Sequence, residues 1–277
     1  MNTSKTQKVL SWTSAIVILL VISGPFLWAL ITSLKPEALA VSYPPLFWPT
    51  STTLEAYREV LTTETFLSDL TNSIIYSVGA VAVSLVVGVP AGYAAARLKF
   101  RGKQMLMLTI LATSMVPGVA LLVPTYILLD RMGLLSNNMV LIVILSARLI
   151  PQTVWFIQNF VTALPVEVEE AGFIDGGTRL QVVCRLVLPL IKPGIAAVAV
   201  MGIITTWNDY VTVAVFAPDV AARTLQVALV NQVFDSIGIS WSYFMAFAIV
   251  ASVPVVLIFM LAQRWFVAGL TAGTVKG

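Results

Sequence analysis

A short polar segment, residues 163–193, holds the residues whose types and spacing point to recognition of another protein. Leu164-Pro165 opens a helix there, because proline is allowed in a first helical turn. Acids crowd that turn, where the helix dipole favours negative charge. They are Glu167, Glu169 and Glu170. The chemistry expected of this segment is therefore binding by a charged helix.

The same segment carries the signals for a turn and a second helix. Gly176-Gly177 stops the first helix, as glycine does at a left-handed terminus. Thr178 and Gln181 have the spacing of a capping box, and Leu188-Pro189 ends the second helix. We predict a helix–turn–helix that lies beneath a membrane, since it is too short and too polar to span one.

Three apolar side chains of this loop are costly to leave in water. They are Val166, Phe173 and Ile174. We expect them to fill a groove on a partner protein, as an amphipathic helix does. The alternative is a structural inner loop with ordinary capping signals. Cys184 in the second helix is interpreted as an inert small apolar residue, because no second thiol or histidine is present to activate it.

Two ionisable residues, Arg148 and Asp209, lie inside long apolar runs. Charges placed in a membrane usually face a cavity or each other. Arg148 and Asp209 therefore indicate one of two roles. Either they line a polar substrate path, or they have a structural role in subunit packing or in snorkelling to the membrane surface. Trp155 and Trp207 allow stacking on a sugar ring, but a core or interfacial position is the commoner fate of tryptophan.

The elements that must position these residues are membrane spans. Hydrophobic residues make up 58% of the 277 residues and charged residues only 10%, with a net charge of +3. A soluble domain of this size cannot bury that much apolar surface. The sequence therefore predicts an all-α integral membrane protein, and its small net charge indicates topology and not nucleic-acid binding.

The apolar runs predict six transmembrane helices in a single transmembrane domain, residues 1–277. Their ranges are 12–34, 71–96, 105–129, 139–162, 194–216 and 242–264. With the N-terminus inside, eleven of the sixteen basic residues fall in inner segments and four in outer ones, which agrees with the positive-inside rule. This arrangement places the N- and C-termini inside and makes 163–193 a cytoplasmic loop between the fourth and fifth helices. Residues 267–277 form a cytoplasmic tail.

The outer loop, residues 35–70, is expected to be extended and aromatic, followed by a short helix on the membrane surface. Thr52 and Glu55 have capping-box spacing, and one apolar face follows. That face comprises Leu54, Tyr57, Val60 and Leu61. Within the second span, Gly88 and Gly92 have the spacing of close helix packing.

Composition also limits the chemistry that the chain can perform. Without histidine there is no ordinary imidazole base and no histidine-ligated metal or haem. A single cysteine excludes an intramolecular disulfide and a zinc or iron–sulfur cluster, so we expect no bound metal. An intramembrane enzyme is therefore a weak alternative. A secondary transporter is another, but internal repeats and buried coupling acids are not seen.

The sequence resembles the permease subunits of binding-protein-dependent ABC importers of the type I fold. The resemblance rests on a loop motif, on a motif in the fifth span and on the C-terminal tail. These are Glu170-Ala171-Gly172, Asp175-Gly176 and Leu188-Pro189 in the loop, Trp207-Asn208-Asp209-Tyr210 in the span, and Gly269 to Gly277 in the tail. The loop departs from the family pattern at Gly172, where a second alanine is expected. The span motif resembles the carbohydrate branch, and the tail resembles the second permease of maltose-type importers.

The resemblance implies a sugar permease of the bacterial inner membrane that pairs with a homologous second permease, two ATPases and an external binding protein. The loop would sit in a cleft on one ATPase, where Glu170 would meet a basic group. ATP and Mg²⁺ would bind to the ATPases and none to this chain, which lacks a Walker A pattern. The tail residues expected to reach the ATPases are Thr271, Gly273, Lys276 and Gly277. The nearest alternative is an ABC permease for an amino acid, a peptide or phosphate.

Overall fold

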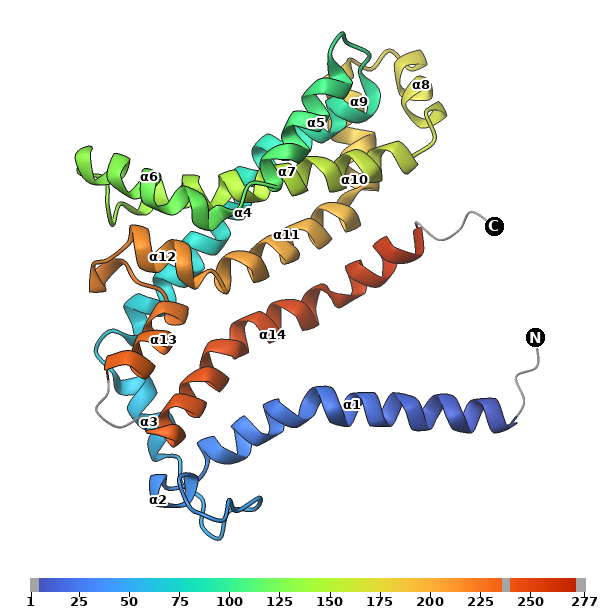
Figure 1. The fold of residues 1–277 in the computed structure, drawn as a ribbon. Helices are drawn as coiled ribbons and strands as arrows, with labels where there is room; N and C mark the ends of the chain where they lie inside the picture. Colours follow the sequence, from blue (N-terminus) through green and yellow to red (C-terminus); the bar gives the residue numbers. More distant parts are fainter. Residues whose placement is uncertain (1–4, 236–239, 273–277) are drawn as a thin grey trace. The chain divides into compact units, whose positions relative to one another are not determined.

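The structure is a computed structural model, and it describes residues 5–235 and 240–272. Within those residues every regular element is helical (Figure 1). The α-helices are α1 Lys5–Ser33, α2 Glu37–Ala40, α3 Glu55–Thr62, α4 Phe66–Arg97, α5 Lys103–Ser114, α6 Gly118–Arg131, α7 Asn138–Ala163, α8 Glu167–Ile174, α9 Arg179–Val182, α10 Leu188–Leu190, α11 Lys192–Trp207, α12 Tyr210–Phe216, α13 Leu225–Asp235 and α14 Trp241–Ala272. A π-helical turn, Val183–Val187, and a 3₁₀ turn, Val220–Ala222, complete them.

Four of the described helices are long and apolar enough to cross a membrane, and the number rises to six if each of two bent pairs counts as one span. The four are α1, α4, α7 and α14, each overlapping an expected span. The all-helical membrane fold is therefore confirmed, and the exact count of six spans stays a prediction.

The two bent pairs are α5 with α6, at 86°, and the run Arg179–Leu190 with α11, at 71°. Two of the expected spans, the third and the fifth, are broken. The third consists of α5 and α6, which meet at 86° around Pro117, because proline disfavours a helical residue before it and cannot continue the helix. The fifth consists of α11 and α12. It breaks at Asn208-Asp209, where the carboxylate of Asp209 caps the new helix by accepting a hydrogen bond from the N–H of Thr212 at 2.9 Å.

The chain divides into two compact units. The first comprises Met1–Phe66 and Leu229–Val253 and contains α1 to α3. Only 6% of the apolar window of α1 is buried within the protein, so its surface is left to lipid or to another subunit.

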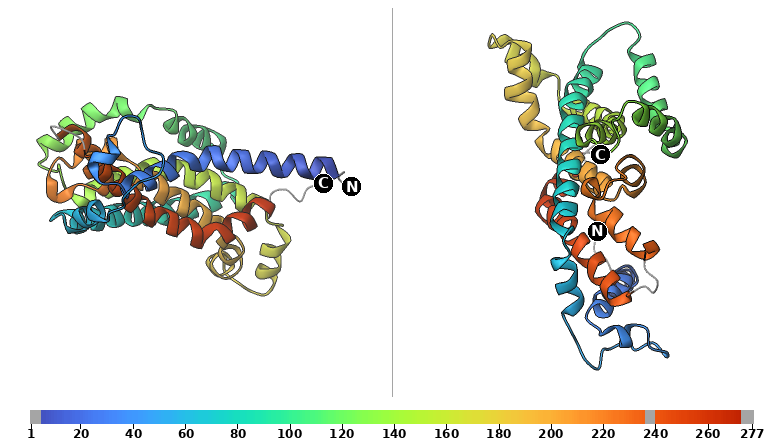
Figure 2. Two further views of the ribbon diagram at one scale, coloured as in Figure 1. Left: turned by 90° about the horizontal axis from the view of Figure 1, so that it is seen from below. Right: turned by 90° about the vertical axis from the view of Figure 1, so that its left-hand side faces the viewer.

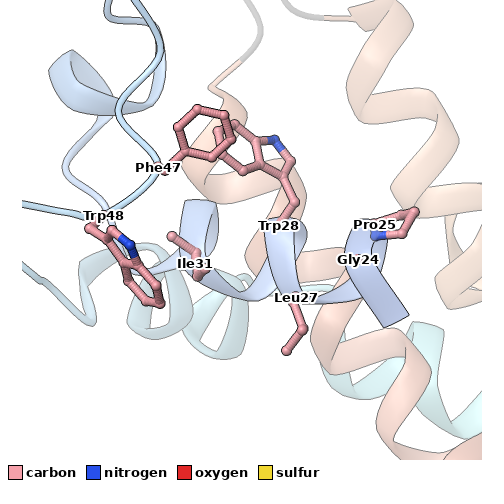
Figure 3. Close-up of a pocket in the computed structure, with 7 residues that line it drawn as sticks. All are labelled: Gly24, Pro25, Leu27, Trp28, Ile31, Phe47 and Trp48. Atoms are coloured by element: carbon pink, nitrogen blue, oxygen red, sulfur yellow. The ribbon is translucent and has the colours of Figure 1, made fainter. Parts of the chain in front are cut away.

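Beside α1, Phe47 makes an edge contact with Trp28 at 5.5 Å between ring centroids, and Trp48 lies near Ile31 (Figure 3). These side chains line a cavity of about 550 Å³.

The short outer helix exists as α3, but its predicted cap at Thr52 is wrong. The hydroxyl of Thr53, and not that of Thr52, accepts a hydrogen bond from the N–H of Glu55 at 3.1 Å. Ala56 and Val60 are the buried residues of α3. Of the other positions on the predicted apolar face, Tyr57 is half-buried and Leu54 and Leu61 are exposed. That this face lies on a membrane surface stays a prediction.

Within the same unit, Glu37 of α2 caps the first turn of α14. Its carboxylate accepts hydrogen bonds from the N–H groups of Trp241 and Ser242 and from the hydroxyl of Ser240, each at 2.9 Å. Burial pushes the pKa of Glu37 upward, but the hydrogen bonds from the backbone of Ser242 and Trp241 and from Ser240 favour the ionised form and bring the pKa below its usual value.

The second unit comprises Leu67–Ala228 and Pro254–Gly277. Its long helix α4 runs through the unit without a break (Figure 2). Glycines bring α4 close to α7: a Cβ placed on Gly88 would lie 2.5 Å from Thr153, and one on Gly92 would lie 2.8 Å from Ile157. The expectation that these glycines serve helix packing is confirmed.

Candidate functional site

The loop that follows α7 is built by local signals in the sequence. Helix α7 ends at Ala163, Leu164 has an extended backbone, and α8 begins at Glu167 after Pro165. Helix α8 then ends at Ile174, and Gly176 adopts a left-handed φ of 82°. The predicted glycine stop is confirmed, because only glycine adopts this conformation without strain.

The three acids of α8 have different environments. Glu167 and Glu170 are exposed, whereas Glu169 is buried. The carboxylate of Glu169 accepts a hydrogen bond from the Arg97 Nε at 2.5 Å and another from the Tyr93 hydroxyl at 2.8 Å. Sequence reasoning missed this pair. The available signal was that Tyr93 and Arg97 are four residues apart on α4 and therefore share one helix face.

Gly172 is the position where the loop departs from the family pattern, and its surroundings account for the glycine. A Cβ placed there would lie 2.6 Å from Leu186 and 3.1 Å from Val182. Leu186 belongs to the π-helical turn, whose extra residue per turn changes the direction of the side chains that follow. The neighbouring Ala171 is exposed, as is Asp175, the C-cap residue of α8.

The second helix of the loop starts as predicted, and it ends within one residue of the predicted position. Thr178 and Gln181 form a capping box, with hydrogen bonds of 2.8 and 3.4 Å. The helical run passes through the π-helical turn and α10 and ends at Leu190, one residue after Pro189, before a bend of 71°.

The apolar side chains of the loop remain uncovered by this chain. Val166 is 49% exposed, Phe173 39% and Ile174 85%. The Arg179 guanidinium lies 5.8 Å from the centroid of the Phe173 ring. The loop therefore presents an apolar surface with acids and a base beside it, which suits a protein partner more than water.

The structure brings together the two charges that lie inside apolar runs. The Arg148 Nη1 lies 2.6 Å from the Asp209 Oδ2 and 2.7 Å from the Thr212 hydroxyl. The Asp209 side chain is 12% exposed, but that of Arg148 is 54% exposed. The pair thus neutralises the acid and leaves one side of the guanidinium open.

Arg148 begins a polar stripe along α7. Gln152, Trp155 and Asn159 follow it at spacings of four, seven and eleven residues, which places all four on one helix face. All four are exposed within this chain. A polar, uncovered face on a membrane span is the face expected to line a cavity or to meet a polar surface of another subunit.

The other residues predicted for the substrate path and for the tail lie outside the polar stripe on α7. Trp207 is buried at the end of α11, so stacking on a sugar ring would require its displacement. Asn208 is exposed, and its amide donates a hydrogen bond to the Ile204 carbonyl at 2.8 Å. In the tail, Thr271 lies in α14, while Gly273, Lys276 and Gly277 lie outside the described residues. Among residues 5–235 and 240–272, no group of three potential metal ligands is found.

The sequence of this chain matches a known family over most of its length. A sequence model of the "Binding-protein-dependent transport system inner membrane component" family matches residues 88–272. The chain is 31% identical over 265 residues to the diacetylchitobiose uptake system permease protein DasC of Streptomyces coelicolor, with 95% of each chain covered. It is 27% identical over 275 residues to the trehalose/maltose transport system permease protein MalG of Thermococcus litoralis, with 98% of each covered.

The fold has also been seen in a solved structure. A chain of a bacterial ABC transporter involved in the import of the acidic polysaccharide alginate superposes with a TM-score of 0.82. The match covers 96% of this chain and 99% of the other, at 22% identity. At this identity the comparison supports the fold and no detail of specificity.

Proposed function

Because the chain belongs to the binding-protein-dependent transport system inner membrane components, we propose that it is a permease subunit of an ABC importer that takes up a sugar. It would form half of a pore with a homologous permease, and an external binding protein would deliver the substrate. The observation that carries the proposal is the family match over residues 88–272, which includes the whole loop from α8 to α10. The sugar class is supported by relatives named for uptake of diacetylchitobiose and of trehalose or maltose.

The subunit is proposed to cross the inner membrane six times, with both termini in the cytoplasm. The bent pair of α5 and α6 then counts as the third crossing and α11 with α12 as the fifth, while α9 and α10, which form a bent pair with α11, stay on the cytoplasmic side. The chain has no catalytic role of its own in this proposal, since ATP and Mg²⁺ would bind to two partner ATPases. The tail, with Thr271 at the end of α14 and Gly273, Lys276 and Gly277 beyond it, would extend toward those ATPases.

The loop from α8 to α10 would connect the ATPases to the pore. Glu170 is exposed on α8 and is free to meet a basic group on an ATPase, while Val166, Phe173 and Ile174 supply an apolar face for the same cleft. Closure of the ATPases on ATP would move α8, and this movement would switch the pore between inward- and outward-open states.

The stripe on α7 would form part of the sugar path. Arg148, Gln152 and Asn159 offer hydrogen-bond donors that suit sugar hydroxyls, and Trp155 offers an aromatic face. Asp209 would hold Arg148 in place through the 2.6 Å ion pair. Trp207 and Asn208 would support the helix break that positions Asp209.

The proposal is tested by copurification of ATPases with the permease and by ATP hydrolysis stimulated by a loaded binding protein in liposomes. Glu170→Ala would remove one partner of the charge pair that we propose becomes buried on docking, a loss of roughly 2–5 kcal/mol, and should weaken docking at least about tenfold. Gly176→Val places a side chain at a φ of 82°, at a cost of about 1–2 kcal/mol, and should also detach or uncouple the ATPase.

The matched control is Gly133→Val, because Gly133 also has a positive φ, 64°, and open space around it, but lies between α6 and α7. It should keep its ATPase. If Glu170→Ala and Gly176→Val both retain full ATPase binding and full stimulated hydrolysis, the loop does not couple the ATPase to the pore. Uptake of labelled oligosaccharides, amino acids and phosphate then separates the sugar proposal from its alternatives.

A further inference from the structure

We propose that Arg97 and Glu169 are positioning residues that fasten α8 to the inner end of α4, so that α4 relays movements of α8 to the outer side of the subunit. This inference rests on the proposed coupling function of the loop and names the chain's own groups that transmit the movement. Glu170 would face the partner ATPase, whereas Glu169, one residue earlier, faces inward.

The fastening has three hydrogen bonds. Arg97 donates from Nε to Glu169 at 2.5 Å and from Nη2 to the Leu164 carbonyl at 2.8 Å, and the Tyr93 hydroxyl donates to Glu169 at 2.8 Å. The side chains of Arg97 and Glu169 are only 11% and 6% exposed. Bonds between ionised groups with so little water around them are shorter and stronger than neutral ones. Arg97 thus holds both α8 and the extended residue that precedes it.

Without these hydrogen bonds, α8 could rotate relative to α7 at Leu164. Leu164 separates α7 from α8 and has a backbone ψ of 137°, so the two helices do not form one rigid rod. Because Arg97 binds the Leu164 carbonyl and Glu169 together, the joint is fixed to α4. A displacement of α8 must then displace the inner end of α4 as well.

The other end of α4 is fastened in a similar way. Asp69, in the first turn of α4, makes a bidentate ion pair with Arg223. The Arg223 Nε lies 3.0 Å from Oδ1 of Asp69, and Nη2 lies 3.2 Å from Oδ2. The Asn72 amide donates to the Ala221 and Arg223 carbonyls at 2.8 and 2.9 Å, and the Ser73 hydroxyl accepts from the N–H of Leu225 at 2.9 Å. These contacts tie the outer end of α4 to the segment between α12 and α13.

Between the two ion pairs α4 is uncharged and continuous. No acidic or basic residue occurs from Leu70 to Ala96. The 28 residue steps from Asp69 to Arg97 span about 42 Å of helix, longer than a hydrocarbon core of about 30 Å. The ion pairs can therefore lie in the two polar layers of the bilayer with an apolar rod between them. The close packing at Gly88 and Gly92 keeps that rod against α7.

The test uses the assembled transporter in liposomes and compares copurified ATPase with the rise in ATP hydrolysis on addition of loaded binding protein. Glu169→Gln and Arg97→Gln should keep a full complement of ATPase, but stimulation should fall roughly 2- to 30-fold. The exchange variant, Arg97→Glu with Glu169→Arg, should recover part of the stimulation, which a purely structural loss would not allow. Glu167→Gln, an exposed acid on the same helix, is the matched control and should behave as wild type.

Tyr93→Phe provides a milder variant, because it removes one hydrogen bond to Glu169 and leaves both charges. It should lower stimulation less than Glu169→Gln does. If Glu169→Gln keeps full stimulation of ATP hydrolysis while Gly176→Val loses it, the proposed role of Arg97 and Glu169 is wrong and the proposed function of the chain stands. If both variants keep full stimulation, the proposed role and the proposed function are both wrong. Loss of ATPase from Glu169→Gln would place Glu169 in the docking surface and would also overturn the fastening.

Discussion

Arg148 on α7 and Asp209 at the start of α12 form an ion pair of 2.6 Å, and the same carboxylate caps α12 through the N–H of Thr212. One acid therefore performs two tasks: it ends the helix break after Trp207, and it holds the first residue of the exposed stripe on α7. The two tasks can be separated by substitution, because asparagine is a good cap but carries no charge.

Asp209→Asn should therefore leave the subunit folded and assembled while it lowers substrate uptake, since only the ion pair is lost. Asp209→Ala removes the cap as well, at an additional cost of about 0.5–2 kcal/mol, and should lower the thermal stability of the assembled complex. Uptake into proteoliposomes and unfolding in detergent report the two losses. Normal uptake with Asp209→Asn would remove the pair from the substrate path.

The cap that Glu37 provides to α14 should make stability depend on pH. A carboxyl whose pKa is lowered by folding stabilises the protein above its usual pKa, about 4.3, and this contribution disappears as the pH falls through the lower folded value. Glu37→Gln should therefore be less stable than wild type at pH 7, by about 1 kcal/mol as for other caps, and the difference should shrink below pH of about 4. Thermal unfolding between these pH values measures it, with the exposed Glu64→Gln as control. A difference that stays constant with pH would contradict the capping role.

The contact between α4 and α7 should tolerate no added side chain at Gly88. Gly88→Ala would place a methyl group 2.5 Å from Thr153 and should destabilise the subunit by about 1–3 kcal/mol. Gly24→Ala in α1 is the matched control, because nothing lies within 4 Å of its Cβ, and alanine there should stabilise the helix by up to about 1 kcal/mol. Equal effects of the two substitutions on the midpoint of unfolding would rule out close packing as the reason for Gly88.

Topology can be read from the labelling of single cysteines in a Cys184→Ser background, since Cys184 is exposed. Cysteines in place of Tyr43 and Val220, both exposed, should react with an impermeant maleimide from outside intact cells. One in place of Lys99 should react only after the membrane is opened. Labelling of position 99 from outside would overturn the arrangement with both termini inside.

The tail should influence regulation more than assembly. Deletion of Thr271 to Gly277 removes the family-like end of the chain, including Lys276, and leaves all candidate spans intact. The stimulation of ATP hydrolysis by loaded binding protein should change, while the ATPase still copurifies. Unaltered stimulation would show that the tail is dispensable for coupling.

Much of the fold was predictable because its signals are local. Apolar runs gave the positions of α1, α4, α7 and α14, and the glycine stop at Gly176 and the capping box at Thr178 depend only on neighbouring residues. The break at Pro117 was missed for a physical reason. Proline ends a helix in one context and starts one in another, and neighbouring packing decides which occurs.

The site was predictable only in part, because burial depends on residues far apart in the sequence. Three glutamates in one helical turn look alike in the sequence, and only the arrival of Arg97 and Tyr93 from α4 distinguishes Glu169 from Glu170. Arg148 and Asp209 were each recognised as costly intramembrane charges, but their pairing was not predicted, because it depends on how α7 and α12 pack.

The pairing of Arg148 with Asp209 also has a consequence for the biogenesis of the protein. The two residues are 61 positions apart, so a ribosome adding about 5–20 residues per second makes the acid roughly 3–12 s after the base. An arginine at the centre of a span opposes insertion by about 2.5–3.5 kcal/mol. Helix α7 already has the lowest mean hydropathy, 1.9, of the four single-helix candidate spans. During that interval its leucines and isoleucines must hold the cation in the bilayer, or the translocon must retain α7 until α12 emerges.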